Sequence, residues 1–308
     1  MNPTRSAPPP PDDPVFDLER PRAVPPVRPV PEWRAEGALA QAYAELRDAM
    51  QVPWVGVITQ ALAHYERFYL EAWSRLRPAV ESAWFARHCH AIAQTAVDGV
   101  AATLSPADQR GALRAAGYGD REVQGIRTTL DALNHGNPQY LVYATAVKLA
   151  LLGVPLGADA RDEARLSPRP APRPLADTPP GLVMIEEHHA LADVKAVYAD
   201  IKATLRLPFV NSDYKAMARW PSYFEPAWGA LRPQVDSAEY DALRGEVHRQ
   251  AVQAALDLPV PYRLDQDAAR ALGMPDAQVR ELIDVISLFQ WLLSGLVVNV
   301  TWFRAALR

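Results

Sequence analysis

The chain has 308 residues, about twice the common domain size, which suggests two domains or one duplicated unit. It is 49% hydrophobic and 22% charged, as expected of a soluble globular protein with enough chain for a sizeable core. A formal net charge of -4 argues against nucleic acid as the main partner, and the single cysteine, Cys89, excludes an internal disulfide framework and makes a cysteine-rich zinc site implausible.

The 29 prolines are distributed unevenly and divide the chain. Eleven fall in residues 1–31 and seven in residues 153–181, and neither stretch has hydrophobic periodicity. We therefore expect a Pro-rich disordered leader (1–31), a first helical segment (32–152), a Pro-rich linker (153–181) and a second helical segment (182–308). There is no secretory h-region, and the apolar stretch 287–300 is too short to span a bilayer, so a cytoplasmic location is expected.

The apolar residues of the first segment follow a helical period. Tyr43, Leu46 and Met50 form one stripe, and Pro53 is predicted to open the next helix, with Trp54 and Ile58 on its apolar face. Further helices are expected around residues 123–133 and 282–298, and strand-type alternation is absent. The sequence thus predicts an all-α fold.

The two helical segments resemble each other. Residues 38–82 align without a gap with residues 193–237, and 13 of the 45 positions are identical, including the run Leu76–Pro78 against Leu231–Pro233. The similarity resumes between residues 115–123 and 271–279 at an offset of 156 instead of 155. This indicates an internally duplicated helical repeat, and we expect the two copies to pair about a pseudo-twofold axis as a pseudo-dimer within one chain.

One polar substitution distinguishes the copies. Ile58, on the apolar face of the first copy, corresponds to Asp213 in the second. A buried carboxylate persists only if it is paired, neutralised or used, so Asp213 is a candidate general base with a raised pKa. The alternative is that Asp213 lies near a helix start, caps backbone amides there and borders the core.

A second polar intrusion is Asn134, which shares a helix face with Leu130 and Leu141 and corresponds to Gln290. The two amides could bond each other across the pseudo-twofold as structural links, or Asn134 could help to hold a water beside Asp213. Dinucleotide-binding, Walker, zinc-protease and nucleophile-elbow motifs are all absent, and His88 and His90 do not share a helix face as metal ligands would. No metal site is therefore expected.

Three segments together resemble a known family: VPWVGVITQALAHYERFYLEAW, LNHGNPQYLVYATAV and LPFVNSDYKAMARWPSYFEPAW. They are similar to the DehI-type, or group I, 2-haloacid dehalogenases, and most closely to the D-specific members. The similarity covers the chain from about residue 35, duplication included.

The resemblance implies an all-α hydrolase that needs no cofactor or metal and has its active site between two repeats. Its base, matched by Asp213, activates a water that attacks C2 of a 2-haloalkanoic acid and expels halide with inversion. It further implies that Asn134 positions the water and that Trp54, Val57, Asn211, Ser212 and Phe289 line the substrate pocket. A homodimer is also implied, and no nucleic-acid or membrane partner is expected.

Two pocket positions depart from the family pattern. Val57 stands where the family has an aromatic residue, and Phe289 where it has a tyrosine, so the wall stays apolar with altered size and hydrogen bonding. The family position that Asn211 matches holds either alanine or asparagine, and asparagine accompanies restriction to D substrates.

Two alternative functions stay open. One is a non-catalytic helical module that binds a small acid, or binds a protein through its Pro-rich leader. The other is a different water-activating hydrolase, for instance one that acts on epoxides.

Overall fold

The computed structural model describes residues 13–157, 159–169 and 181–308, and regular structure in these residues is helical. Two isolated β-bridges, Ser82–Pro168 and Leu156–Tyr262, are the exceptions among them. The prediction of an all-α fold is therefore confirmed. The α-helices are α1 Gly37–Met50, α2 Val57–Leu62, α3 Glu66–Val80, α4 Ala83–Gly99, α5 Arg110–Ala115, α6 Asp120–Leu151, α7 Ala192–Leu205, α8 Ser212–Met217, α9 Pro221–Leu231, α10 Ala238–Leu256, α11 Gln266–Ala271 and α12 Asp276–Ala305.

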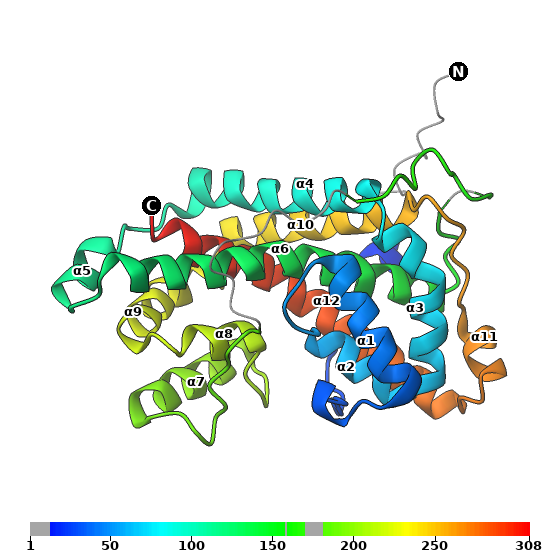
Figure 1. Ribbon diagram of the computed structural model, residues 1–308, viewed down its shortest axis with the longest axis horizontal. Helices are drawn as coiled ribbons and strands as arrows, with labels where there is room; N and C mark the ends of the chain where they lie inside the picture. The colour runs from blue at the N-terminus through cyan, green and yellow to red at the C-terminus, as the bar shows by residue number, and fades with distance from the viewer. Residues whose placement is uncertain (1–12, 158, 170–180) are drawn as a thin grey trace.

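The two longest helices, α6 and α12, form the centre of the molecule and run in opposite directions across it (Figure 1). The C-terminal halves of both helices are buried all round, because other helices cover both sides of the pair. By length and composition alone α12 could cross a membrane, but 72% of its apolar window is buried inside the protein. This burial is typical of the core helix of a globular fold.

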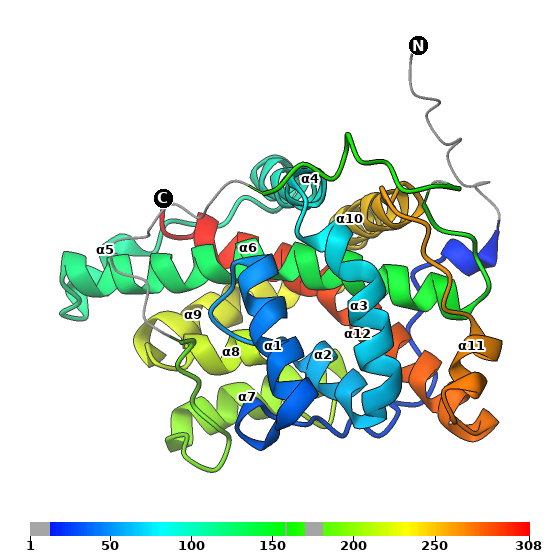
Figure 2. The same cartoon turned by 45° about the vertical axis from the view of Figure 1, so that its right-hand side comes forward.

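The remaining helices lie on two sides of this central pair. Helices α4 and α10 cover one side, and the other carries two separate groups, α1–α3 and α7–α9 (Figures 1 and 2). The short helices α5 and α11 lie at opposite ends of the molecule. As a result, the loops that lead into α2 and α8 approach each other over the middle of α6 and α12.

The second helix of the first copy starts later than predicted. Helix α1 ends at Met50, its C-cap residue Gln51 has a left-handed φ of 54°, and a non-helical loop follows through Gly56 before α2 begins at Val57. Pro53 therefore lies in the connecting loop, and the prediction that it opens the helix was wrong. The reason is tertiary: a Cβ on Gly56 would lie 2.8 Å from the Tyr140 ring, so the loop is held against α6.

The described part of the leader is packed against the helices, contrary to the prediction of a disordered segment. The backbone amide of Val30 donates to Gln60 O at 2.9 Å, and Tyr43 donates its hydroxyl to Val30 O at 2.8 Å. Two residues before Val30, Arg28 forms an ion pair with Glu281 at 2.6 Å. Residues 13–31 thus run as an extended strap over the helices, while residues 1–12 lie outside the described part.

The described linker residues, 153–157 and 159–169, are likewise packed against the helices. The carbonyl of Ser167 accepts from the Ala83 amide at 2.8 Å, and Arg169 donates from its amide to Glu81 O at 3.0 Å. The Arg169 guanidinium reaches inward to Ala49 O at 2.6 Å. Pro-rich composition predicted the absence of helix here, but it did not predict these backbone and side-chain contacts.

Candidate active site

A small cavity lies where the loops before α2 and α8 meet the central helices. Its volume is about 20 Å³, and a water molecule needs at least ~10–15 Å³. The cavity is mostly apolar, with polar atoms concentrated at the start of α8. Its lining comprises Trp54, Gly56, Val57, Ile58, Asn137, Tyr140, Asn211, Ser212, Asp213, Phe289, Leu293 and Leu296.

Asp213 is the charged residue of this lining, in the first turn of α8 and only 3% exposed. Burial raises the pKa of its carboxyl from 3.8 to about 6, because the charged form loses its hydration. Hydrogen bonds from the Asn137 amide and from its own backbone amide oppose this shift. A carboxylate in this state can take a proton from a water near neutral pH.

Asn137 of α6 is the side chain that contacts this carboxylate. Its Nδ2 donates to Asp213 Oδ1 at 2.7 Å, and both groups are buried. Asn134, which we predicted for this position, is not among the residues that line the cavity. Its Oδ1 accepts instead from the hydroxyl of Thr301 on α12 at 3.2 Å. The structure thus places Asn137 beside the Asp213 carboxylate, where the sequence had predicted Asn134.

The physical reason is the phase of the helix. Residues three apart on an α-helix differ by about 60° around its axis, enough to direct one amide to α12 and the other to α8. Leu133, Asn137 and Leu141 follow each other at intervals of four, so the sequence did carry a signal for Asn137. Asn134 and Gln290 do not bond each other either, because Gln290 donates to Thr145 at 3.1 Å.

The two residues before Asp213 add polar atoms to the cavity. Asn211 is the N-cap residue of α8, but its side chain makes no capping bond. Its Oδ1 is buried and has no hydrogen-bond partner among the described residues. Ser212 is buried beside it and lines the same cavity. A buried amide oxygen without a partner is costly, so the site is suited to a ligand or water that donates to Asn211.

The apolar wall comes from three different elements. Trp54 lies in the loop before α2, Val57 is the first residue of α2, and Phe289 belongs to α12. Gly136 lets the Trp54 ring rest on α6, because a Cβ there would overlap the ring. Trp54 is also held through its backbone, since its carbonyl accepts the Tyr140 hydroxyl at 2.8 Å.

The structure therefore brings together six of the seven predicted site residues: Asp213, Trp54, Val57, Asn211, Ser212 and Phe289. Sequence reasoning missed the other six lining residues, which are Gly56, Ile58, Asn137, Tyr140, Leu293 and Leu296. For the leucines no signal was available, because a leucine beside a cavity and one in the core have the same pattern. In the described ranges, no group of three or more His, Cys, Asp and Glu side chains is placed to hold a metal ion.

Comparison with known proteins gives consistent matches. The family model described as "Halocarboxylic acid dehydrogenase DehI" matches residues 53–214. An (R)-2-haloacid dehalogenase from Pseudomonas putida is 47% identical over 290 residues, which are 94% of this chain and 95% of that protein.

Two solved structures are similar over the same extent. A D-2-haloacid dehalogenase mutant in complex with D-2-CPA has a TM-score of 0.89, and a D-2-haloacid dehalogenase with L-LA has one of 0.88. Each is 46% identical and covers 94% of this chain and 99% of the other. With a family model matched over more than half of its residues and this identity over nearly its whole length, the chain belongs to the DehI family.

Proposed function

We propose that the protein hydrolyses short 2-haloalkanoic acids, with a preference for the D enantiomer. The single observation that carries the proposal is the buried Asp213, with a pKa of about 6, beside a cavity the size of one water. The relatives support the substrate class, since the P. putida protein and the solved structures are 2-haloacid dehalogenases.

In the proposed reaction a water between Asp213 and C2 of the substrate is the nucleophile. Asn137 holds Oδ1 of Asp213, which leaves Oδ2 to accept a proton from the water as its oxygen bonds to C2. The carbon–halogen bond breaks at the same time and the halide leaves with the electron pair. Water attacks a saturated carbon poorly by itself, and general-base help contributes roughly 10²–10⁴ in rate. Attack opposite to the halide inverts C2.

Asn211 has two proposed roles in this geometry. Its buried, unpartnered Oδ1 accepts the second hydrogen of the attacking water, which fixes the direction of the oxygen lone pair toward C2. Its bulk also narrows one side of the cavity, so that only the D arrangement of halide and alkyl group leaves C2 facing the water. Trp54 and Phe289 supply the polarisable apolar surface that a departing halide needs.

We further propose that the active site lies between two duplicated repeats related by a pseudo-twofold axis. Helices α1 and α2 recur as α7 and α8 at an offset of 155 residues. Tertiary contacts recur as well, because Tyr198 donates to Ile185 O at 2.7 Å as Tyr43 does to Val30 O at 2.8 Å. A homodimer of such pseudo-dimers remains the expected assembly, to be tested by sedimentation.

The decisive experiment is halide release from resolved D- and L-2-chloropropionate, followed by chiral analysis of the lactate. We expect chloride only from the D enantiomer and L-lactate as the product. No release from either enantiomer would refute the proposed function. Release from both would remove only the stereochemical role of Asn211.

Direct attack by water is tested by a single turnover in ¹⁸O-water. If Asp213 activates water, the hydroxyl of the first lactate carries the label. An unlabelled first product would mean that the oxygen came from Asp213 through an ester intermediate.

A further inference from the structure

A second cavity lies directly behind one wall of the catalytic cavity. Leu296 of α12 lines both, so its side chain separates Asp213 from a space of about 10 Å³. This inner cavity lies between the end of α7, the start of α10 and α12. Its lining residues are Leu205, Tyr214, Val235, Tyr240, Arg244, Trp291, Leu292, Gly295, Leu296 and Asn299.

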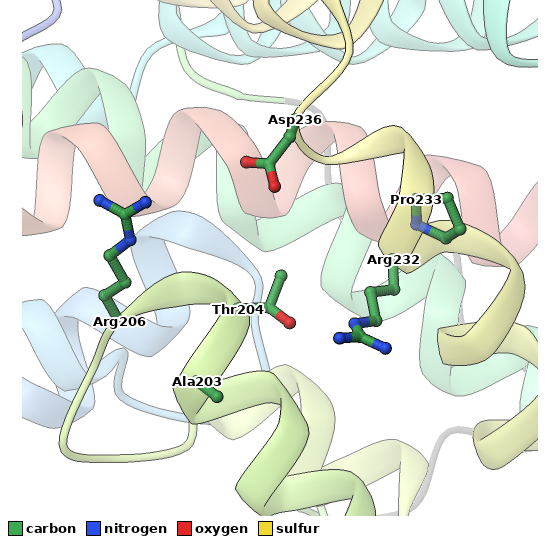
Figure 3. A pocket seen from close by; sticks show the side chains of 6 residues that line it. All are labelled: Ala203, Thr204, Arg206, Arg232, Pro233 and Asp236. Carbon is green, nitrogen blue, oxygen red and sulfur yellow. The ribbon is translucent and has the colours of Figure 1, made fainter.

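The inner cavity lies in turn beneath an open surface groove of about 520 Å³. Consecutive residues line the two spaces: Leu205 and Val235 face the inner cavity, while their neighbours Arg206 and Asp236 face the groove. In Figure 3, Arg206 and Arg232 stand on opposite sides of the groove, with Thr204 between them. Leu296 is thus common to the two cavities, and two pairs of neighbouring residues, 205–206 and 235–236, separate the inner cavity from the groove.

Arginine side chains lie along the groove and the inner cavity. Arg206 lines the groove and Arg244 the inner cavity. Arg20, from the leader, donates to Arg206 O at 2.7 Å. Its guanidinium lies 4.8 Å from the centre of the Trp291 ring, and that of Arg244 lies 5.2 Å from the same ring.

Two of the four arginines near these spaces have acidic partners. Arg232 pairs with Asp200 at 3.3 Å, and one nitrogen of Arg244 pairs with Asp241 at 2.8 Å. Asp236 is the carboxylate on the groove itself. The Nε of Arg244 is buried and has no partner among the described residues, so it can still donate to an anion.

The corresponding positions of the first half of the chain are filled. Gly295 and Leu296 correspond, 156 residues earlier, to Gln139 and Tyr140. The Gln139 side chain donates to Met50 O at 2.9 Å and accepts from Arg169 of the linker at 3.0 Å. In the first half a glutamine that contacts a linker arginine thus stands where the second half has Gly295.

From these observations we propose that the groove and the inner cavity are the route by which the anionic substrate reaches Asp213 and the anionic products leave. Arg20, Arg206 and Arg244 attract the anion, and Leu296 is the side chain that moves aside to admit it. Clefts of one charge raise the association rate of oppositely charged ligands, an effect that falls with ionic strength. The identity of the anion as a 2-haloacid rests on the proposed function; the route does not.

The charge is tested with the double variant Arg206→Gln and Arg244→Gln. At low ionic strength we expect kcat/KM for D-2-chloropropionate to fall by about tenfold with kcat within twofold, because steering acts on association. Raising sodium sulfate should lower kcat/KM of the wild type and leave the double variant almost unchanged. Arg121→Gln is the matched control. It removes an exposed charge in the first turn of α6 and should behave as wild type.

The passage itself is tested with Gly295→Ala. A Cβ there would lie 3.0 Å from the Tyr240 hydroxyl, inside the inner cavity and outside the catalytic one. We expect kcat/KM to fall severalfold while the pH midpoint of activity stays unchanged. Gly229→Ala is the matched control, because nothing lies within 4 Å of a Cβ at that helical position.

Binding without turnover separates the route from the reaction. In Asp213→Asn, the association rate of D-2-chloropropionate is measured by stopped-flow tryptophan fluorescence, with and without the arginine and glycine substitutions. Association slowed about tenfold by the arginine pair supports the route even if the wild type releases no halide. The proposed route would be overturned if neither the arginine pair nor Gly295→Ala changed the association rate or kcat/KM relative to the parent protein. This outcome does not depend on whether the enzyme is a dehalogenase.

Discussion

At the scale of single residues, the state of Asp213 determines what the cavity can do. A carboxylate with an ordinary pKa would be charged at every physiological pH but would be a weak base. Burial raises the pKa of Asp213 to about 6, which makes the carboxylate a better proton acceptor while leaving it mostly ionised at pH 7. The Asn137 hydrogen bond limits that rise, so the pair sets the balance between basicity and ionisation.

The first prediction concerns the pH dependence of activity. Because the base must be ionised, kcat/KM should increase with pH and level off above the pKa of Asp213, about 6. Initial rates of halide release between pH 4.5 and 8.5 measure this midpoint. A profile flat through this range would show that no group titrating near 6 is the base.

The second prediction concerns Asp213→Asn, in which kcat should fall by roughly 10²–10⁴ while the folded protein gains stability. The folded-state pKa is above the ordinary value of 3.8, so the native protein is stabilised by protonation below pH 4 and loses this stabilisation as pH rises through about 6. Removing the charge should therefore stabilise the protein by up to about 3 kcal/mol above pH 6. Thermal melts at pH 8 and pH 4 should show a higher Tm only at pH 8. If Asp213→Asn and the wild type had the same Tm at each of the two pH values, Asp213 would not be a desolvated carboxylate.

The third prediction distinguishes Asn137 from Asn134. Asn137→Ala should lower kcat by about 10² and move the pH midpoint above that of the wild type, because the hydrogen bond that favours the carboxylate is lost. Asn134→Ala should keep the wild-type pH midpoint. Its free energy of unfolding should fall by about 1 kcal/mol, because the hydrogen bond to Thr301 is lost. The opposite pattern would restore Asn134 as the residue that positions the water.

At the scale of elements, the site depends on close packing between loops and the central helices. Two glycines, Gly56 and Gly136, stand where a Cβ would overlap the rings of Tyr140 and Trp54. They let the loop before α2 lie directly on α6, which places Trp54 against the same turn that carries Asn137. In the second half of the chain the loop before α8 brings Asn211 and Asp213 to this turn.

The fourth prediction is that Gly136→Ala displaces the Trp54 ring into the cavity. Both kcat/KM and the tryptophan fluorescence spectrum should change, with at least a tenfold loss in kcat/KM because the apolar wall is moved. Gly111→Ala, at a helical position where nothing lies within 4 Å of a Cβ, is the control. Wild-type kinetics in Gly136→Ala would mean that the Trp54 ring is not part of the substrate wall.

At the scale of the whole molecule, the leader between residues 13 and 31 belongs to the folded body. It contacts α2 through Val30, α12 through Arg28, and α10 through Phe16, whose carbonyl lies 2.9 Å from His248 Nε2. These contacts span elements far apart in the chain. The strap therefore links the two halves of the helical body in addition to the linker.

The fifth prediction follows for truncation. Removing residues 1–12 should leave Tm and activity unchanged, whereas removing residues 1–31 should lower Tm by several degrees, because Tyr43 and His248 lose their backbone partners. Differential scanning fluorimetry compares the two truncations directly. If the longer truncation melted like the wild type, the strap would contribute nothing to stability.

Sequence by itself determined the helical fold and Asp213, because helical periodicity and an internal comparison of two similar segments are local signals. The described parts of the Pro-rich stretches hold no α-helix, but composition could not show that residues 13–31 and 159–169 pack on the body, since that depends on partners distant in the chain. Tertiary structure alone decided which asparagine reaches Asp213, because 60° of helix phase separates the α12-facing amide from the α8-facing one. It also decided which leucine forms a wall between two cavities, since burial gives core and cavity leucines the same pattern.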